Sequence, residues 1–286
     1  MQIGIVGAGK VGCSLGKYLA ESAACQRADI RITGYAGRSE ESVESAATFT
    51  KTKAFDSVQQ LVKKSDVLFI TTPDDAIASV WEQLKKETIY GKIICHFSGS
   101  LSSELFSGRE ELGVSACSIH PMYAFSNKFT SYQQLNSVLF TMEGDKKALE
   151  QMSSLFHITG NEVCIISPDK KVTYHAAASM VSNMMIGLYE QSIRLLEDCG
   201  FEREAARALV KPLVSGNVQS FLEKSPEEAL TGPIERNDLE TVRKHLSELS
   251  GRERELYVNL GWILTDLAKK KNPERDYKEM SQLFEE

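Results

Sequence analysis

The chain has 286 residues, of which 42% are hydrophobic and 25% are charged, and its formal net charge at pH 7 is −6. The length indicates one large domain or two ordinary ones. The acidic balance excludes the basic surface of a nucleic-acid-binding protein, and no apolar run approaches the ~20 residues of a membrane span.

The first predicted element is a buried strand, Ile3–Val6, which leads into a glycine-rich turn and then a helix. The turn has the pattern G-x-G-x-x-G. In this order the first glycine permits the tight turn, the second lets a pyrophosphate approach the backbone, and the third lets the helix pack close to the strand. The helix start then offers free N–H groups to phosphates. The residues expected to bind the cofactor are Gly7, Gly9, Lys10, Val11 and Gly12. The alternative is a glycine-rich turn that binds nothing.

A second strand is predicted at residues 30–36, and the residues after it indicate which dinucleotide is bound. NAD-preferring folds usually place an acid here, to bind the ribose 2′-hydroxyl. Here the residues are Arg38 and Ser39, and the nearest acid, Glu40, is expected to begin the next helix. Because a guanidinium and a hydroxyl suit a phosphate, we predict a site for the 2′-phosphate of NADP. The alternative is a solvated surface arginine.

Two further strands, 66–70 and 92–95, are predicted to end in polar residues at the edge where parallel sheets bind ligands. Thr71 and Thr72 follow the first strand and are expected to contact the nicotinamide ribose. Asp74 and Asp75 are expected to cap the next helix. Ser98, after the second strand, is predicted to bind the cofactor from the same edge.

Two successive strands end in a histidine, His96 and His120. Each is either a structural residue bonded to backbone carbonyls or a member of the site. A strand, a helix and a last strand between residues 138 and 166 are expected to complete the sheet. We therefore predict a doubly wound, mostly parallel α/β Rossmann domain at 1–166, followed by an all-α domain at 167–286.

The second half begins with a predicted helix at 171–198, whose apolar residues lie nearly all round and indicate a buried central helix. At about 42 Å it is long enough to cross a dimer interface. Further helices are predicted at 201–222, interrupted by Pro212 and Gly216, and at 238–249 and 253–270. Three apolar residues of the charged tail, Tyr277, Met280 and Phe284, share one helical side, so we expect the tail to dock.

A polar stripe on the long helix is the second candidate site. His175, Ser179 and Asn183 follow one another at intervals of four and share one face. Buried polar groups need partners, which are either neighbouring helices or a substrate. In the second case His175 is the proton donor or acceptor, and Asn183 holds a carbonyl, hydroxyl or imine. The residues predicted to be catalytic are therefore His175, Ser179, Asn183 and His120.

The six cysteines have no C-x-x-C spacing, so the sequence supports no metal site. Several lie in apolar runs and are expected to be buried free thiols in a reducing cytoplasm. The chain starts directly in a core strand, without a recognisable signal peptide. We expect a cytoplasmic protein.

The motifs at 7–12, 35–39 and 72–77 resemble the NADP-binding half of a Rossmann-like family. That family is grouped with pyrroline-carboxylate reductases, deazaflavin-dependent NADP reductases and 3-hydroxyacid dehydrogenases. The motifs at 118–122, 174–183 and 229–242 resemble its helical partner domain, often labelled a domain of unknown function. The resemblance implies a homodimer formed through the helices.

The sequence departs from the family pattern at several positions. Asn237 replaces a usual glycine, and Gly37 precedes Arg38 where a serine or asparagine is common. The hydroxyacid dehydrogenases use a lysine on the long helix, whereas the matching face here carries His175, and Lys171 lies one turn upstream. Their mechanism is therefore not transferred.

Together the motifs predict an enzyme, an NADP-dependent oxidoreductase. It would transfer hydride between NADP(H) and a small polar substrate of the hydroxy acid, keto acid or imine class. The alternative is a sensor or regulatory protein that binds NADP without turnover, and a weaker one is a structural dimerisation module. Fold alone does not decide between them.

Overall fold

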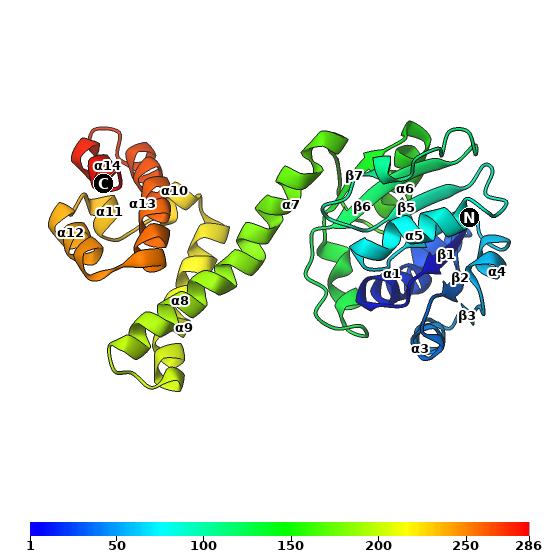
Figure 1. Cartoon of the computed structure of the whole chain (residues 1–286), viewed down its shortest axis with the longest axis horizontal. Coiled ribbons are helices and arrows are strands. Elements are labelled where there is room, and N and C mark those ends of the chain that lie inside the picture. The colour runs from blue at the N-terminus through cyan, green and yellow to red at the C-terminus, as the bar shows by residue number, and fades with distance from the viewer. Residues whose placement is uncertain (286) are drawn as a thin grey trace. The chain divides into compact units, whose positions relative to one another are not determined.

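The computed structural model describes residues 1–285 (Figure 1). The chain forms two compact units, and the division between them falls between Asn183 and Met184. The sequence pattern instead predicts a domain boundary after residue 166, next to the last strand. Among the described residues, no helix is long and apolar enough to cross a membrane.

The first unit is built on one sheet of eight strands, in the order β3-β2-β1-β4-β5-β6-β7-β8. All neighbours pair in parallel except β6 and β7. The order reverses between β1 and β4, the point at which such sheets bind dinucleotides. The strands are β1 (Gln2–Val6), β2 (Arg31–Ala36), β3 (Lys53–Ala54), β4 (Val67–Ile70), β5 (Ile93–His96), β6 (Ser115–Pro121), β7 (Phe140–Gly144) and β8 (Val163–Ile165).

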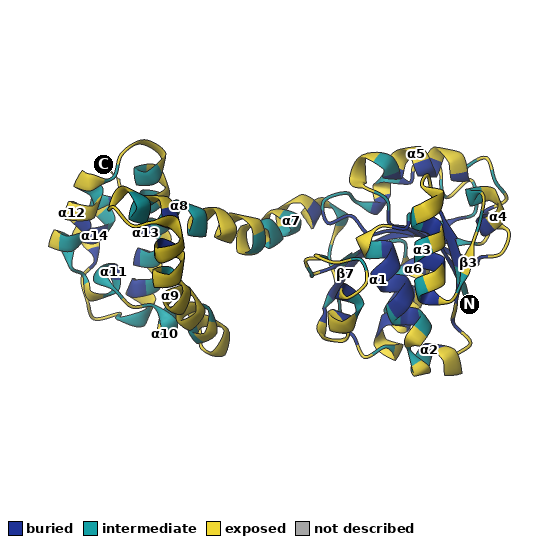
Figure 2. Cartoon of the chain, turned by 90° about the horizontal axis from the view of Figure 1, so that it is seen from below, coloured by how far each residue is buried: buried dark blue, intermediate teal, exposed yellow. Residues whose placement is uncertain are grey.

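Helices cover both faces of this sheet, with α1, α3 and α6 on one face and α5 on the other (Figure 2). The central strands are apolar throughout because both of their faces are buried. In β4, Val67 and Phe69 belong to one core cluster, and Leu68 and Ile70 belong to the other. The helices are α1 (Lys10–Glu21), α2 (Ala23–Arg27), α3 (Glu40–Thr50), α4 (Val58–Val62), α5 (Asp74–Leu84) and α6 (Lys146–Ile158). The predicted Rossmann architecture is confirmed.

One local expectation in this unit is wrong. Asp74 and Asp75 do not cap α5, because the helix begins at Asp74 itself and Pro73 occupies the N-cap position. The Asp74 carboxylate instead accepts hydrogen bonds from the Ser98 and Ser100 hydroxyls, at 2.7 and 3.2 Å. The local sequence predicts that the Asp74 side chain caps the helix, but the loop after β5 binds it instead.

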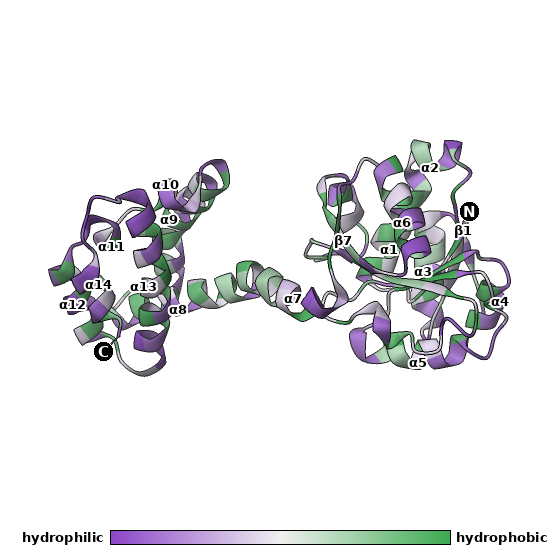
Figure 3. Ribbon diagram, turned by 90° about the horizontal axis from the view of Figure 1, so that it is seen from above, coloured by the Kyte–Doolittle hydropathy of each residue, from purple (hydrophilic) through white to green (hydrophobic). Residues whose placement is uncertain are grey.

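The long helix is helical throughout its predicted range, as α7 (Lys171–Ser179), a π-helical segment (Met180–Met184) and α8 (Met185–Asp198). It is not the buried helix that its apolar composition predicts. Hydrophobic residues run along it (Figure 3), and many of them face solvent: Val172 is 70% exposed and Val181 is 72% exposed. These side chains would be buried, as their composition predicts, only if a surface outside the described chain covered them.

The second unit is entirely helical. Its elements after α8 are α9 (Arg203–Glu223), α10 (Pro226–Ala229), α11 (Pro233–Arg236), α12 (Leu239–Glu248), α13 (Gly251–Lys271) and α14 (Lys278–Leu283). The expected breaks at Pro212 and Gly216 are wrong, since α9 continues through both. The tail docks as predicted, because Tyr277, Met280 and Phe284 are buried in the core of this unit. The predicted all-α domain is confirmed.

Candidate functional site

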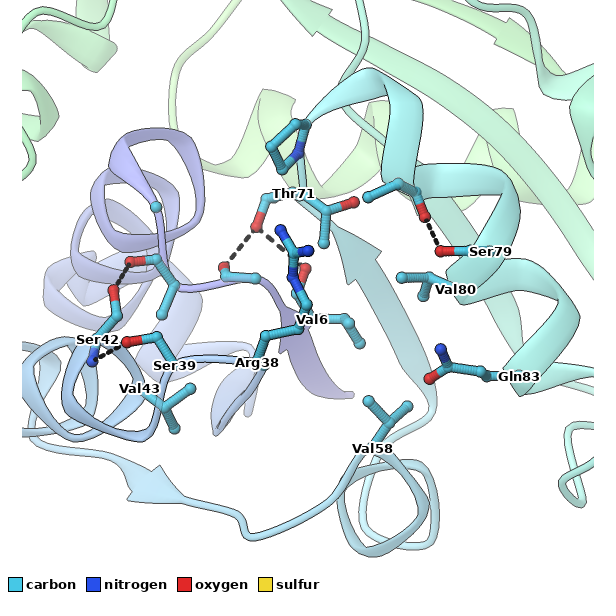
Figure 4. A pocket seen from close by; sticks show the side chains of 17 residues that line it. Val6, Arg38, Ser39, Ser42, Val43, Val58, Thr71, Ser79, Val80 and Gln83 are labelled. Atoms are coloured by element: carbon cyan, nitrogen blue, oxygen red, sulfur yellow. Dashed lines mark hydrogen bonds between the residues drawn. The ribbon is translucent and has the colours of Figure 1, made fainter.

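A pocket of roughly 350 Å³ lies at the carboxyl edge of the sheet, where the strand order reverses. Its walls come from the glycine turn (Gly7–Gly12), the residues after β2, the residues after β4, and one side of α5. Figure 4 shows that polar and apolar side chains line both sides, with Ser39, Ser42 and Val43 facing Ser79, Val80 and Gln83 across the pocket. The site residues predicted from sequence that line it are Gly7, Gly9, Arg38, Ser39, Thr71 and Thr72.

Two glycines of the turn are required by packing. Gly7 has a φ of +106°, in the region that favours glycine. A Cβ on Gly12 would lie 2.3 Å from the Gly7 carbonyl oxygen and from the Thr71 hydroxyl. Thr71 closes the arrangement by donating a hydrogen bond of 2.7 Å to that same carbonyl. Gly7, Gly12 and Thr71 therefore shape the turn.

Gly9 and Thr72 have no such internal reason. A Cβ added to Gly9 would meet no atom within 4 Å, so its backbone borders open space. The Thr72 hydroxyl is buried and has no partner within the described chain. A buried hydroxyl without a partner is costly, at ~1–3 kcal/mol. Both features fit a bound group that has phosphates against Gly9 and a hydrogen-bonding group beside Thr72.

Ser39 lies across the pocket from α5, and the Arg38 side chain extends between them (Figure 4). Ser39 caps α3 by accepting a hydrogen bond from the Ser42 amide. Arg38 is exposed and makes no hydrogen bond or ion pair with residues 1–285. An unpaired guanidinium beside a helix start is suited to an anion.

The other predicted cofactor residues lie outside this pocket. Lys10 and Val11 form the first turn of α1, directly after the lining residues. Ser98 lies at the end of β5, where its hydroxyl is bonded to Asp74 and its carbonyl oxygen accepts a hydrogen bond of 3.0 Å from the Lys171 ammonium. Ser98 thus connects the edge of the sheet to α7.

Two of the predicted catalytic residues, His120 and His175, come together at this edge. Their ring centroids are 5.9 Å apart, and the planes are nearly perpendicular. A Cβ added to Gly99 would lie 2.4 Å from His175 Nδ1 and 2.9 Å from His120 Nε2, so both rings converge on that glycine. His175 Nδ1 is buried and has no partner within the described residues. We call Gly99, His120, Lys171, Tyr174 and His175 the histidine cluster.

The cluster holds His120 by its other ring nitrogen. His120 Nδ1 lies 2.8 Å from the Tyr174 hydroxyl. Burial, together with the positive charge of Lys171, lowers the pKa of His120 to about 4. The ring is therefore neutral near pH 7, and if the tyrosine donates to Nδ1, then Nε2 carries the proton that faces Gly99.

Lys171 is the buried cation of the cluster, with a side chain only 1% exposed. Burial lowers its pKa to about 8, against the opposing influence of Glu143 and Asp74. Its ammonium is held by the Ser98 carbonyl oxygen and lies 5.8 Å from the centre of the Tyr174 ring. A lysine with this pKa can exchange a proton near neutral pH.

The rest of the polar stripe does not join the cluster. Ser179 is half-buried at the end of α7. Asn183 is exposed in the π-helical segment, where its side-chain oxygen accepts a hydrogen bond from the Ser182 hydroxyl. The π-helical turn alters the register on which the shared face of these residues was predicted.

Sequence reasoning missed Lys171, Tyr174 and Asp74 as members of the site. Lys171 precedes His175 by four residues and therefore continues the polar stripe, which is the signal that points to it. Tyr174 and Asp74 carry no such local signal, because their partners are contributed by distant segments. Tyr174 is 54 residues from His120, and Asp74 is 24 residues from Ser98.

The described residues hold no group of three or more His, Cys, Asp or Glu side chains that could bind a metal ion. The cysteines are free thiols. The expectation of burial is wrong for two of them: Cys13, Cys25, Cys95 and Cys117 are buried, whereas Cys164 and Cys199 are exposed.

The fold and the edge site define a Rossmann-like domain, and residues 1–121 match the family model of that description. Residues 138–262 match the model described as a domain of unknown function, DUF2520. The chain thus joins a Rossmann-like domain to a DUF2520 domain, as the resemblance of its motifs predicts. No curated protein matches the chain.

Solved structures share this fold over nearly the whole chain. Protein TM1727 from Thermotoga maritima is 24% identical, with a TM-score of 0.74 and coverage of 94% of this chain and 99% of that one. A putative NADP oxidoreductase, BF3122 from Bacteroides fragilis, is 20% identical over 93% and 98%, with a TM-score of 0.68. A Plasmodium falciparum pyrroline carboxylate reductase with NADP bound is 14% identical over 98% of both chains, with a TM-score of 0.56. At these identities the likeness concerns the fold.

Proposed function

We propose that the protein is an NADP-dependent oxidoreductase that acts on a small polar substrate of the hydroxy acid, keto acid or imine class. The observation that carries this proposal is that two neighbouring sites at one sheet edge contain polar groups without partners. The pocket has an unpartnered Thr72 hydroxyl and an unpaired Arg38, and the histidine cluster has an unpartnered His175 nitrogen. Unmatched polar groups gathered in this way are suited to ligands.

The residues of the pocket fit a dinucleotide. The backbone at Gly9 and the start of α1 would hold the pyrophosphate, Thr71 and Thr72 would lie beside the nicotinamide ribose, and Arg38 with Ser39 would bind the 2′-phosphate. When bound, the cofactor supplies the hydride chemistry, while the protein supplies position and proton transfer.

The histidine cluster supplies the proton. Reduction of a carbonyl or an imine adds a proton to the oxygen or nitrogen as hydride reaches the carbon, and oxidation removes it. His175 is the proton donor or acceptor in this proposal, since its Nδ1 is buried and uncommitted. Neutral His120 orients the same group, and Lys171 contributes positive charge where a carboxylate or a developing negative charge would lie.

A second copy of the chain is the proposed cover for the exposed apolar residues of the long helix. Contiguous exposed apolar surface marks an interaction site, and the polar stripe occupies the less exposed side of α7. A homodimer through the helices accounts for an apolar composition that the single chain leaves in solvent. The buried free thiols fit a protein that works in the reducing cytoplasm.

Titration of the purified protein with NADPH and NADH tests the cofactor. We expect saturable NADPH binding, tighter than NADH binding, and weaker NADPH binding by about tenfold or more in Arg38→Ala with little change for NADH. If the protein did not bind NADPH at millimolar NADPH concentration, the proposal would be wrong.

Oxidation of NADPH in the presence of a panel of imines, keto acids and aldehydes tests the chemistry. Turnover of one class assigns the substrate. NADPH binding with no turnover across the panel would instead favour an NADP-binding sensor or regulatory protein.

A further inference from the structure

Lys128 places a second cation beside the pocket, in a segment that the proposed function does not use. Its ammonium donates hydrogen bonds to the hydroxyl and the carbonyl oxygen of Ser42, at 3.1 and 3.2 Å. Lys128 lies between β6 and β7, 86 residues from Ser42 in the sequence. The segment between β6 and β7 therefore brings this charge to α3, although the two are distant in the sequence.

Ser42 connects this ammonium to the glycine turn. Its hydroxyl donates a hydrogen bond of 3.1 Å to the Ala8 carbonyl oxygen, and its amide donates to Ser39. Ser39 and Ser42 both line the pocket, and Figure 4 shows them side by side at the start of α3. An anion bound at these two hydroxyls would lie within reach of the Lys128 side chain, which has a flexible four-carbon stem.

Lys128 differs from the other lysine that reaches this helix. Lys17 contacts the Phe49 carbonyl oxygen and is also paired with Glu21 at 2.7 Å. Lys128 has no carboxylate partner among residues 1–285, and its hydrogen bonds go only to neutral oxygens of Ser42. An ammonium has three donors, so one remains for a ligand.

The position of Lys128 is fixed by its neighbour. The Phe129 ring packs edge-on against Phe49 of α3, with centroids 5.0 Å apart, and Phe49 packs in turn against Tyr132. This aromatic contact holds the segment against α3, so the half-buried lysine is oriented before any ligand arrives. Pre-organised charges lose less free energy on binding than free surface lysines.

We propose that Lys128 binds the 2′-phosphate of the cofactor from the side opposite Arg38, so that two cations from different segments determine the preference for NADP. This inference rests on the proposed function. Neither Arg38 nor Lys128 has a carboxylate partner within the described chain, and Ser39 and Ser42 at the start of α3 lie beside both of them, Ser39 next to Arg38 and Ser42 in contact with Lys128. A phosphate carries enough charge and acceptors to engage both.

The test uses adenosine 2′,5′-bisphosphate and AMP, which differ only in the 2′-phosphate, titrated calorimetrically into the full-length protein. Lys128→Met keeps the alkyl stem and removes the charge. We expect about tenfold weaker binding of the bisphosphate and unchanged binding of AMP. Lys128→Arg should restore most of the affinity. Lys147 is an exposed lysine on α6, and Lys147→Met is therefore the matched control. It should leave the affinity for both probes unchanged.

The outcomes separate this inference from the proposed function. If the wild-type protein binds both probes equally, the preference for NADP fails as a whole. If Arg38→Ala loses the preference for the bisphosphate but Lys128→Met keeps it, the proposed function stands and the role of Lys128 is overturned. An equal loss for both probes in Lys128→Met would also overturn it, because that result indicates a role in shaping the pocket.

Discussion

The glycine turn and the histidine cluster lie at the carboxyl edge of the same sheet, but they are built in different ways. The turn is one continuous piece of backbone, and the hydroxyls of Thr71 and Ser42 donate hydrogen bonds to its carbonyl oxygens. The cluster is assembled from side chains on two segments, at 120 and 171–175, which converge on Gly99. A site made of backbone is shaped by local sequence, whereas a site made of side chains depends on tertiary packing. Substitutions should therefore affect the two sites separately.

The largest expected effect is on turnover by the cluster. Removing the imidazole in His175→Ala should lower the rate of NADPH oxidation, with the best substrate of the panel, by about 10²–10⁴-fold. The affinity for NADPH, measured by fluorescence titration, should stay unchanged. Loss of binding together with turnover would show that the two sites are not separate.

Gly99→Ala tests the same cluster without removing any functional group. The new Cβ would lie 2.4 Å from His175 Nδ1, so the imidazoles must move. Because small displacements of catalytic groups are costly, turnover should fall by about 10²-fold. Full activity in this variant would contradict the convergence of both rings on Gly99 as a catalytic arrangement.

The second largest effect is on the glycine turn, which offers two matched positions. Gly12→Ala places a Cβ 2.3 Å from the Gly7 carbonyl oxygen, and this overpacking should lower the free energy of unfolding by ~1–3 kcal/mol. Gly9→Ala meets no atom within 4 Å, so stability should change by less than ~0.5 kcal/mol, while NADPH affinity falls by about tenfold or more. Urea unfolding and NADPH titration of both variants provide the comparison. Unchanged NADPH affinity in Gly9→Ala would contradict the proposal that the pyrophosphate lies against Gly9.

The difference in construction also explains what the sequence could predict. Gly7, Gly9 and Gly12 follow an apolar strand, and that order alone identifies the turn and its fold. Lys171 could not be assigned in the same way, since its partner, the Ser98 carbonyl oxygen, is 73 residues away. Periodicity places Lys171 and His175 on one face of a helix but does not reveal what packs against that face.

The same limit applies to the apolar residues of the long helix. Hydrophobic composition predicts that side chains such as Val181 are buried, without indicating whether the covering surface belongs to the same chain. The apolar residues of α7 and α8 are exposed in the single chain. Their composition therefore predicts a partner that covers them, and not burial within the fold.

The third effect is on the pH dependence of stability. Burial lowers the pKa of His96 to about 4, from 6.5 in the unfolded chain. Between these values the unfolded state binds the proton more strongly, so stability is full above pH 6.5 and is lost as the pH falls toward 4. The contribution of His96 is on the order of 3 kcal/mol. Within residues 1–285 no histidine lines the pocket, so this pH dependence is expected to leave the pocket itself unaffected.

Urea unfolding at pH 7.5 and pH 5 measures this dependence. His120, whose pKa is lowered in the same direction, should keep part of it in His96→Gln, which lacks the titrating ring. An equal loss of stability in the variant and the wild-type protein would contradict the assignment to His96.

The smallest effect on the single chain concerns the exposed helix. Val181 is 72% exposed, so Val181→Glu should change the free energy of unfolding of one chain by no more than ~0.5 kcal/mol. The same charge placed in a dimer interface is strongly unfavourable, so the variant should elute as a monomer in light-scattering chromatography while the wild-type protein elutes as a dimer. Gln151→Glu, at an exposed position on α6, is the control and should leave the dimer intact. A monomeric wild-type protein would contradict the proposal that a second copy covers the helix. If Val181→Glu remains dimeric, the interface lies elsewhere, and the apolar residues of α7 and α8 are free for another partner.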